Sequence, residues 1–146
     1  MISLDANILI YAADGDAGQR HAQARDTLRR ASQSRAALTE QALFEFFHAA
    51  TRKGKVSFEE AEATIEDLTQ SFNLLLTPPT VVEDALVLRS RYRLGIWDAR
   101  LLAICNVHGC SHLLSEDLQD GGRYGGVTVV NPFKPANAAL VGQLLE

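Results

Sequence analysis

Residues 1–14, MISLDANILIYAAD, join an apolar, strand-like start to an acidic residue, Asp5, only five positions into the chain. Residues 1–5 have the pattern of a short buried strand, and residues 6–13 are interpreted as a helix that begins just after Asp5. A carboxylate at the end of a core segment is unfavourable unless something offsets its charge. Two interpretations remain open. Asp5 either caps the helix, with Asn7 doing similar work, or belongs to a charged site that Asn7 helps to orient.

The composition predicts one globular domain over residues 1–146, with 47% apolar and 22% charged residues. No apolar run approaches the roughly 20 residues of a membrane span, and the start lacks the basic region of a signal peptide. Two cysteines cannot form a disulfide framework, so a reducing cytoplasm is the expected location. The net charge of −4 argues against binding nucleic acid by bulk charge, although a local basic stripe would suffice.

Strand-like and helix-like segments alternate along the chain, which predicts an α/β fold with a mainly parallel sheet of about five strands covered on both faces. The expected strands are residues 1–5, 36–39, 73–77, 111–115 and 126–131. The expected helices are residues 6–13, 17–34, 40–54, 57–72, 80–94 and 98–109, followed by a tail or short helix. Ser57 with Glu60 and Thr80 with Glu83 have capping-box spacing, and Gly95 is expected to end the helix before it.

Acidic residues follow the expected strands. Asp5 ends the first strand, Asp117 follows the fourth, and Asp98 opens a helix on the face that it shares with buried-type residues. In parallel sheets, sites form beyond the carboxyl ends of the strands, so these three carboxylates are expected to converge. Taken singly, each has another explanation: Asp98 as a helix cap, Asp117 and Asp120 as polar turn residues. Periodicity places Glu45 on a solvated helix face, and Glu116 is expected to face solvent.

Convergence of Asp5, Asp98 and Asp117 would need a counter-charge, because two unit charges 4 Å apart repel by about 4 kcal/mol at an effective dielectric of 20. Of the basic residues, only Arg100 lies next to one of them in the sequence. Mg²⁺, or Mn²⁺ in its place, prefers such oxygen ligands, whereas zinc would favour His and Cys. A cation held by carboxylates suits phosphodiester hydrolysis and needs no Ser, Cys or His nucleophile.

Four segments, in this order, resemble the PIN domain family, most closely the bacterial VapC-type ribonuclease toxins. They are ISLDANILIYA with Asp5, LTEQALFEFFHAATRKG with Glu45, GIWDARLLAICNVHGC with Asp98, and HLLSEDLQDG with Asp117. The resemblance implies a three-layer α/β/α sandwich and a Mg²⁺-dependent endoribonuclease. It implies catalytic roles for Asp5, Glu45, Asp98 and Asp117, metal binding by Asp5, Asp98 and Asp117, and supporting roles for Asn7, Ser115 and Asp120. It also implies an RNA substrate, a small antitoxin partner and a homodimer.

Basic residues gather at residues 20–35, 52–55 and 89–93, where they either form solvated helix faces or contact RNA phosphates. Tyr92 and Trp97 are candidates to stack on a base, although the apolar neighbours of Trp97 favour packing. A haloacid-dehalogenase-type phosphatase would need an Asp where Asn7 stands, and a receiver domain would need an Asp at the end of residues 73–77. A PIN fold that binds RNA or protein without cutting is the remaining alternative.

Overall fold

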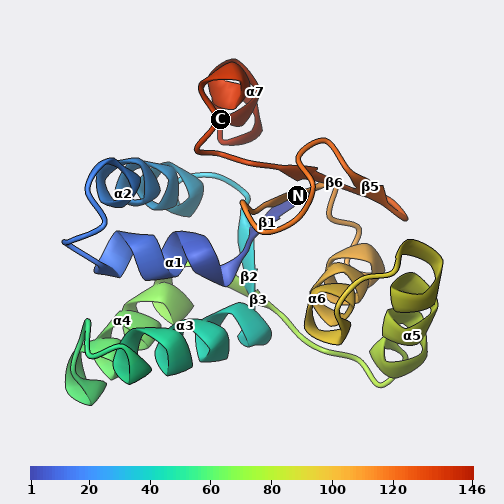
Figure 1. The fold of residues 1–146 in the computed structure, drawn as a ribbon, viewed down its shortest axis with the longest axis horizontal. Helices are drawn as coiled ribbons and strands as arrows, with labels where there is room; N and C mark the ends of the chain where they lie inside the picture. The colour runs from blue at the N-terminus through green and yellow to red at the C-terminus, as the bar shows by residue number, and fades with distance from the viewer.

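The computed structural model describes residues 1–146 and shows strands and helices alternating along the chain (Figure 1). The strands are β1 (Ile2–Leu4), β2 (Ala37–Thr39), β3 (Asn73–Leu75), β4 (His112–Leu114), β5 (Arg123–Tyr124) and β6 (Val127–Val130). The helices are α1 (Ala6–Ala13), α2 (Gln19–Ser32), α3 (Glu40–Arg52), α4 (Phe58–Ser71), α5 (Val81–Tyr92), α6 (Ile96–Val107) and α7 (Ala138–Leu144), with a 3-10 turn, η1 (Pro135–Asn137), before α7. No helix combines the length and the apolar character needed to cross a membrane.

The six strands form one sheet in the order β3-β2-β1-β4-β6-β5, and only β5 runs antiparallel to its neighbour. The predicted mainly parallel sheet is therefore confirmed. Strand β5 was not predicted from the sequence, because its two residues lie within the glycine-rich stretch 120–126 that resembles a loop. Arg123 and Tyr124 pair with Thr128 and Val127 at the edge of the sheet.

Two apolar cores lie on the two faces of the sheet, so the predicted three-layer α/β/α sandwich is confirmed. Helices α1 to α4 and α7 cover one face, and α5 and α6 cover the other (Figure 1). Successive side chains of a strand point to opposite faces: Leu113 belongs to the core under α5 and α6, whereas Leu114 belongs to the core under α1. Both cysteines are free and buried.

The helix ends confirm one predicted cap and contradict two other predictions. Ser57 and Glu60 form a reciprocal capping box at the start of α4, with Glu60 N–H donating to Ser57 Oγ over 3.1 Å. The predicted box of Thr80 is wrong, because Thr80 has helical backbone angles and its side chain caps nothing. Helix α5 ends at Tyr92 rather than near Gly95, because Arg93 adopts a left-handed conformation with φ of 55°.

Ser57 and Thr80 provide a matched pair of variants, because one caps a helix and the other does not. Ser57→Ala is expected to lower the free energy of unfolding by about 1 kcal/mol, because it removes a helix-capping hydrogen bond. Thr80→Ala, which removes no such bond, is expected to change it by less than about 0.5 kcal/mol. Urea unfolding of both variants measures the difference, and equal losses would contradict the assignment of the caps.

Candidate active site

The strand order places a polar site between β1 and β4. The chain leaves β1 towards β2 on one side of the sheet, and β4 lies on the other side, so the order reverses between them. Open α/β sheets bind ligands at such a point, beyond the carboxyl ends of the strands. Asp5 directly follows β1 and Ser115 directly follows β4, and both continue the sheet's backbone bonding: Asp5 N–H donates to Leu114 O over 2.9 Å.

Asp5 fills both of the roles that its sequence position left open. Its Oδ1 accepts a hydrogen bond from Ala6 N–H over 2.7 Å, which caps α1. Its Oδ2 accepts from the Ser115 hydroxyl over 2.7 Å, which ties the ends of β1 and β4 together. The residue is only 4% exposed, so these two donors compensate a carboxylate that has almost no access to water.

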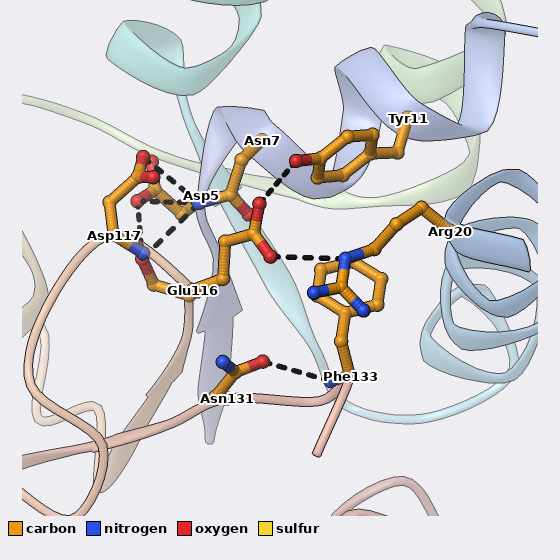
Figure 2. Close-up of polar contacts among 9 residues, drawn as sticks. Asp5, Asn7, Tyr11, Arg20, Glu116, Asp117, Asn131 and Phe133 are labelled. Atoms are coloured by element: carbon orange, nitrogen blue, oxygen red, sulfur yellow. Dashed lines mark hydrogen bonds and ion pairs between the residues drawn. The ribbon is translucent and has the colours of Figure 1, made fainter. Parts of the chain in front are cut away.

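Asn7 joins Asp5 to Asp117 (Figure 2). Its Nδ2 lies 3.1 Å from Asp117 Oδ2 and 3.4 Å from both Asp5 Oδ2 and Ser115 Oγ. Ser115 Oγ also accepts from Asp117 N–H over 3.2 Å, which orients the loop after β4. The oxygen of the same side-chain amide, Asn7 Oδ1, is buried and has no hydrogen-bond partner.

Glu45 and Asp98 reach the same region from helices α3 and α6. The interpretation of Glu45 as a solvated residue is wrong, because its side chain is half-buried and close enough to Asp98 and Asp117 for their charges to act on it. Asp98 is half-buried at the start of α6, as its helix face predicted. The structure therefore brings together Asp5, Glu45, Asp98 and Asp117, with Asn7 and Ser115 between two of them.

The pKa values of three of these acids, Asp5, Glu45 and Asp98, are raised. Burial is the main cause that raises the pKa of Asp5 to about 6; the charges of Asp117 and Glu45 act in the same direction, and the hydrogen bonds from Ser115 and Ala6 oppose them. Burial is also the first cause that raises the pKa of Glu45 and of Asp98, and the charge of Asp117 adds to both. The site is thus short of positive charge.

A buried glutamine, which the sequence pattern did not mark as a site residue, connects α3 and α6. Gln41 Nε2 donates to Glu45 Oε1 over 2.8 Å and to the Trp97 carbonyl over 2.9 Å, and Gln41 Oε1 accepts from Arg100 over 2.7 Å. The guanidinium of Arg100 partly offsets the raised pKa of Glu45. The sequence does contain one sign of the Gln41–Glu45 contact: the two residues are four positions apart and therefore share a helix face.

Glu116 is not solvent-facing, so that prediction is wrong. It accepts a hydrogen bond from the Tyr11 hydroxyl and forms an ion pair with Arg20, whose Nε lies 3.2 Å from Glu116 Oε2 (Figure 2). The Arg20 guanidinium lies 4.7 Å from the centre of the Phe133 ring, against which Tyr11 also packs edge-on. Helices α1 and α2 thereby hold the residue that precedes Asp117.

The structure separates Asp120 from the other predicted site residues. Its Oδ1 accepts hydrogen bonds from Asn131 N–H over 2.8 Å and from Asn137 Nδ2 over 2.9 Å, and Lys134 Nζ lies 3.3 Å from its Oδ2. The bond from Asn131 is the main cause that lowers the pKa of Asp120. Asp120 therefore fixes the segment after β6, beside the site rather than within the acidic group.

Of the two candidates for stacking on a base, Trp97 is the exposed one and Tyr92 is the packed one. Trp97 is 64% exposed, so its predicted packing is wrong; its apolar neighbour Ile96 is also exposed, and only Ala99 and the residues after it in α6 enter the core. Tyr92 packs edge-on against Tyr124, with ring centres 5.1 Å apart, and its hydroxyl accepts from Gly125 N–H.

The acidic group fits a hard divalent cation in its chemistry and its charge. All candidate donors are carboxylate, amide or hydroxyl oxygens, the carboxylates repel one another, and Asn7 Oδ1 is a buried acceptor without a partner. No three His, Cys, Asp or Glu side chains already stand close enough together to hold an ion. Binding would therefore require the carboxylates to move towards each other once their repulsion is offset.

The raised pKa of Asp5 predicts the pH dependence of stability in the presence of a chelator. The folded state binds a proton at Asp5 up to about pH 6, whereas the unfolded state releases it near 3.8, so stability from this group is lost as the pH rises between these values. The variant Asp5→Asn has no carboxyl at this position, so it should not lose this stability as the pH rises. The difference in unfolding free energy between variant and wild type is expected to change by about 2–3 kcal/mol from pH 4 to pH 7.5. Parallel pH profiles from urea unfolding would contradict the burial of a charge at Asp5.

Comparison with known proteins agrees with this architecture. Residues 2–119 match the model of the PIN domain. No curated protein matches the chain. A toxin-antitoxin complex from Klebsiella pneumoniae contains a chain with 25% identity and a TM-score of 0.68, covering 92% of this chain and 99% of that one. A VapBC complex from Rickettsia felis, bound to promoter DNA, has 14% identity and a TM-score of 0.67, with coverage of 90% and 98%.

A sarcin-ricin-loop-cleaving VapC toxin from Mycobacterium tuberculosis has 18% identity and a TM-score of 0.63, covering 80% of this chain and 92% of that one. The two structures below 25% identity support the fold. The family model spans most of the chain, including all four acids of the site. The chain belongs to the PIN domain family.

Proposed function

We propose that this PIN domain is a metal-dependent endoribonuclease and the toxin of a VapC-like toxin–antitoxin pair. The observation that carries the proposal is the convergence of Asp5, Glu45, Asp98 and Asp117 beyond the carboxyl ends of β1 and β4. Membership of the PIN family removes the phosphatase and receiver alternatives.

Mg²⁺, with Mn²⁺ as a substitute, is the proposed cofactor, held by Asp5, Asp98 and Asp117. When bound, the cation supplies the positive charge that offsets these carboxylates, and it lowers the pKa of water. Asn7 and Ser115 keep Asp5 and Asp117 in register through their hydrogen bonds. The Glu116 contacts with Tyr11 and Arg20 hold the backbone next to Asp117.

Glu45 is suited to proton transfer during hydrolysis. Its pKa is raised by burial and by Asp98, and Gln41 fixes one of its oxygens over 2.8 Å. A carboxylate whose pKa is raised towards the operating pH is a stronger base and is still largely ionised, which is the balance that general base catalysis needs. In the proposed reaction, a water oxygen forms a bond to phosphorus while the bond to the leaving ribose oxygen breaks, and that oxygen receives a proton.

RNA would approach between two cationic side chains on either side of the acids. Arg20 lies beside Glu116, and Arg100 lies beside Glu45. Contacts of this kind position the phosphate backbone without reading sequence. They give the negatively charged protein a local means of binding RNA, and they predict that binding weakens as salt increases.

The relatives suggest the partners. The structures from Klebsiella pneumoniae and Rickettsia felis are complexes of toxin with antitoxin, and we propose a small antitoxin protein for this chain as well. A homodimer and a cytoplasmic location, where RNA substrates are found, complete the proposal.

The direct test is cleavage of total RNA by the purified protein with Mg²⁺, with Mn²⁺ and with a chelator. Asp98→Asn is expected to slow cleavage at least about 100-fold, because even the loss of a residue that only orients a metal ligand typically costs 10–100-fold. Asp84→Asn, on the exposed surface of α5, serves as the matched control and should cut at the wild-type rate.

Equal fragments from wild type and Asp98→Asn would reveal a contaminating ribonuclease or a misplaced site. A folded wild-type protein that binds RNA but cuts none with either metal would contradict the nuclease proposal. That outcome would favour a PIN module that binds without cutting.

A further inference from the structure

A cleft of about 510 Å³ opens between α3 and α6, directly beside the acidic group. Its lining residues are Glu40, Gln41, Phe44, Glu45, His48, Trp97 and Arg100. Glu45 belongs to both the cleft and the acidic group, and Trp97 immediately precedes Asp98 in α6. The cleft and the acids therefore form one continuous surface.

Two exposed aromatic side chains give the cleft its apolar part. Phe44 is 67% exposed and Trp97 is 64% exposed, and neither ring is paired with another aromatic ring. Large aromatic rings left open beside a site are typical of binding surfaces. Nucleobases stack on such rings whatever their sequence, because every base has a π-face.

The remaining wall of the cleft is polar and held in place. Gln41 is 6% exposed, and its amide is fully engaged by Glu45, the Trp97 carbonyl and Arg100. Gln41 therefore fixes the backbone of Trp97 relative to α3. The Arg100 guanidinium contributes one bond to Gln41 and lies 3.7 Å from Glu40, which leaves N–H groups available for a base edge or a phosphate.

We propose that this cleft is a subsite for one unpaired nucleobase of an RNA strand, next to the phosphate that is cut. The base stacks on Trp97, with Phe44 on the other side, and Arg100 contacts the polar edge of the base or the neighbouring phosphate. This inference rests on the proposed ribonuclease function and specifies its substrate as RNA with an accessible, unstacked base. The continuity of the cleft with the acids favours a nucleic acid over a protein segment.

Trp97 is the only tryptophan of the chain, so its fluorescence reports directly on the cleft. The probe is a six-nucleotide single-stranded RNA, added to wild-type protein in a chelator so that no cleavage occurs. We expect saturable quenching of the fluorescence. A strand of equal length made of abasic ribose phosphates should give little quenching, because it has the phosphates without the stacking bases.

Two phenylalanine variants provide a matched pair for this titration. Phe44→Ala is expected to weaken the quenching titration about 10-fold, since it removes one wall of the cleft. Phe58→Ala removes a ring of similar exposure, 63%, that lies on α4 outside the cleft, and should leave the titration unchanged. Equal effects of the two substitutions would overturn the assignment of Phe44 to the subsite.

Cleavage kinetics test the same subsite independently. Trp97→Ala is expected to raise KM about 10-fold for a single-stranded RNA while kcat changes little, and Trp97→Phe should restore most of the loss. The Trp97 backbone carbonyl, which Gln41 binds, is present in both variants. An unchanged KM in Trp97→Ala would overturn the proposal.

The outcomes separate this inference from the nuclease proposal. Quenching by RNA without any cleavage would contradict the nuclease and support the cleft as a nucleobase-binding site of a PIN module that does not cut. Cleavage without quenching would contradict the subsite alone. Fluorescence that responds to protein concentration but not to RNA would show that a second copy of the chain covers the cleft, and it would overturn the proposal.

Discussion

Two hydrogen bonds hold the Asp5 carboxylate between the start of α1 and the end of β4, and the rest of the site depends on them. One oxygen caps α1 and the other accepts the Ser115 hydroxyl from the end of β4. A carboxylate that is 4% exposed is costly unless donors and charges compensate it. The same two hydrogen bonds that make its burial tolerable also join the strands on either side of the point where the strand order reverses.

The neighbouring acids add negative charge that the hydrogen bonds to Asp5 do not offset. Asp117 comes from the loop after β4, Glu45 from α3 and Asp98 from α6, so four elements each bring one negative charge to the same edge of the sheet. Hydrogen bonds from Asn7 and Ser115 lessen the repulsion but supply no positive charge. Groups whose pKa values are raised by burial and by one another are typical of functional sites, where stability is given up for chemistry. The nearby cations, Arg20 and Arg100, lie at the margins of the acidic group, where they contact Glu116 and Gln41.

Much of this arrangement could be predicted from the sequence, because the rule that parallel strands end at one edge needs only the order of the elements. It located Asp5, Ser115 and Asp117, and the face of α6 located Asp98. Helical periodicity did not predict the partial burial of Glu45. A helical wheel describes a single helix, whereas the side chain of Glu45 lies against a neighbouring helix, α6. The Gln41–Arg100 bond spans 59 residues and the Tyr11–Glu116 bond spans 105, and no local pattern reports such pairs. Thr80 had the right spacing for a cap, but its own helical backbone angles prevented it.

The most direct test of a cation at Asp5 is the number of protons released when Mg²⁺ binds, obtained by calorimetry in buffers of different ionisation enthalpy. A carboxyl with a pKa of about 6 is half protonated at pH 6 and must lose that proton when a cation replaces it. We expect saturable binding with release of about half a proton from Asp5 at pH 6, with further release from the neighbouring acids, and almost none at pH 8. Asp5→Asn should remove the Asp5 share. Absence of binding heat, or binding at pH 6 without proton release, would contradict the claim that a cation offsets the buried charge of Asp5.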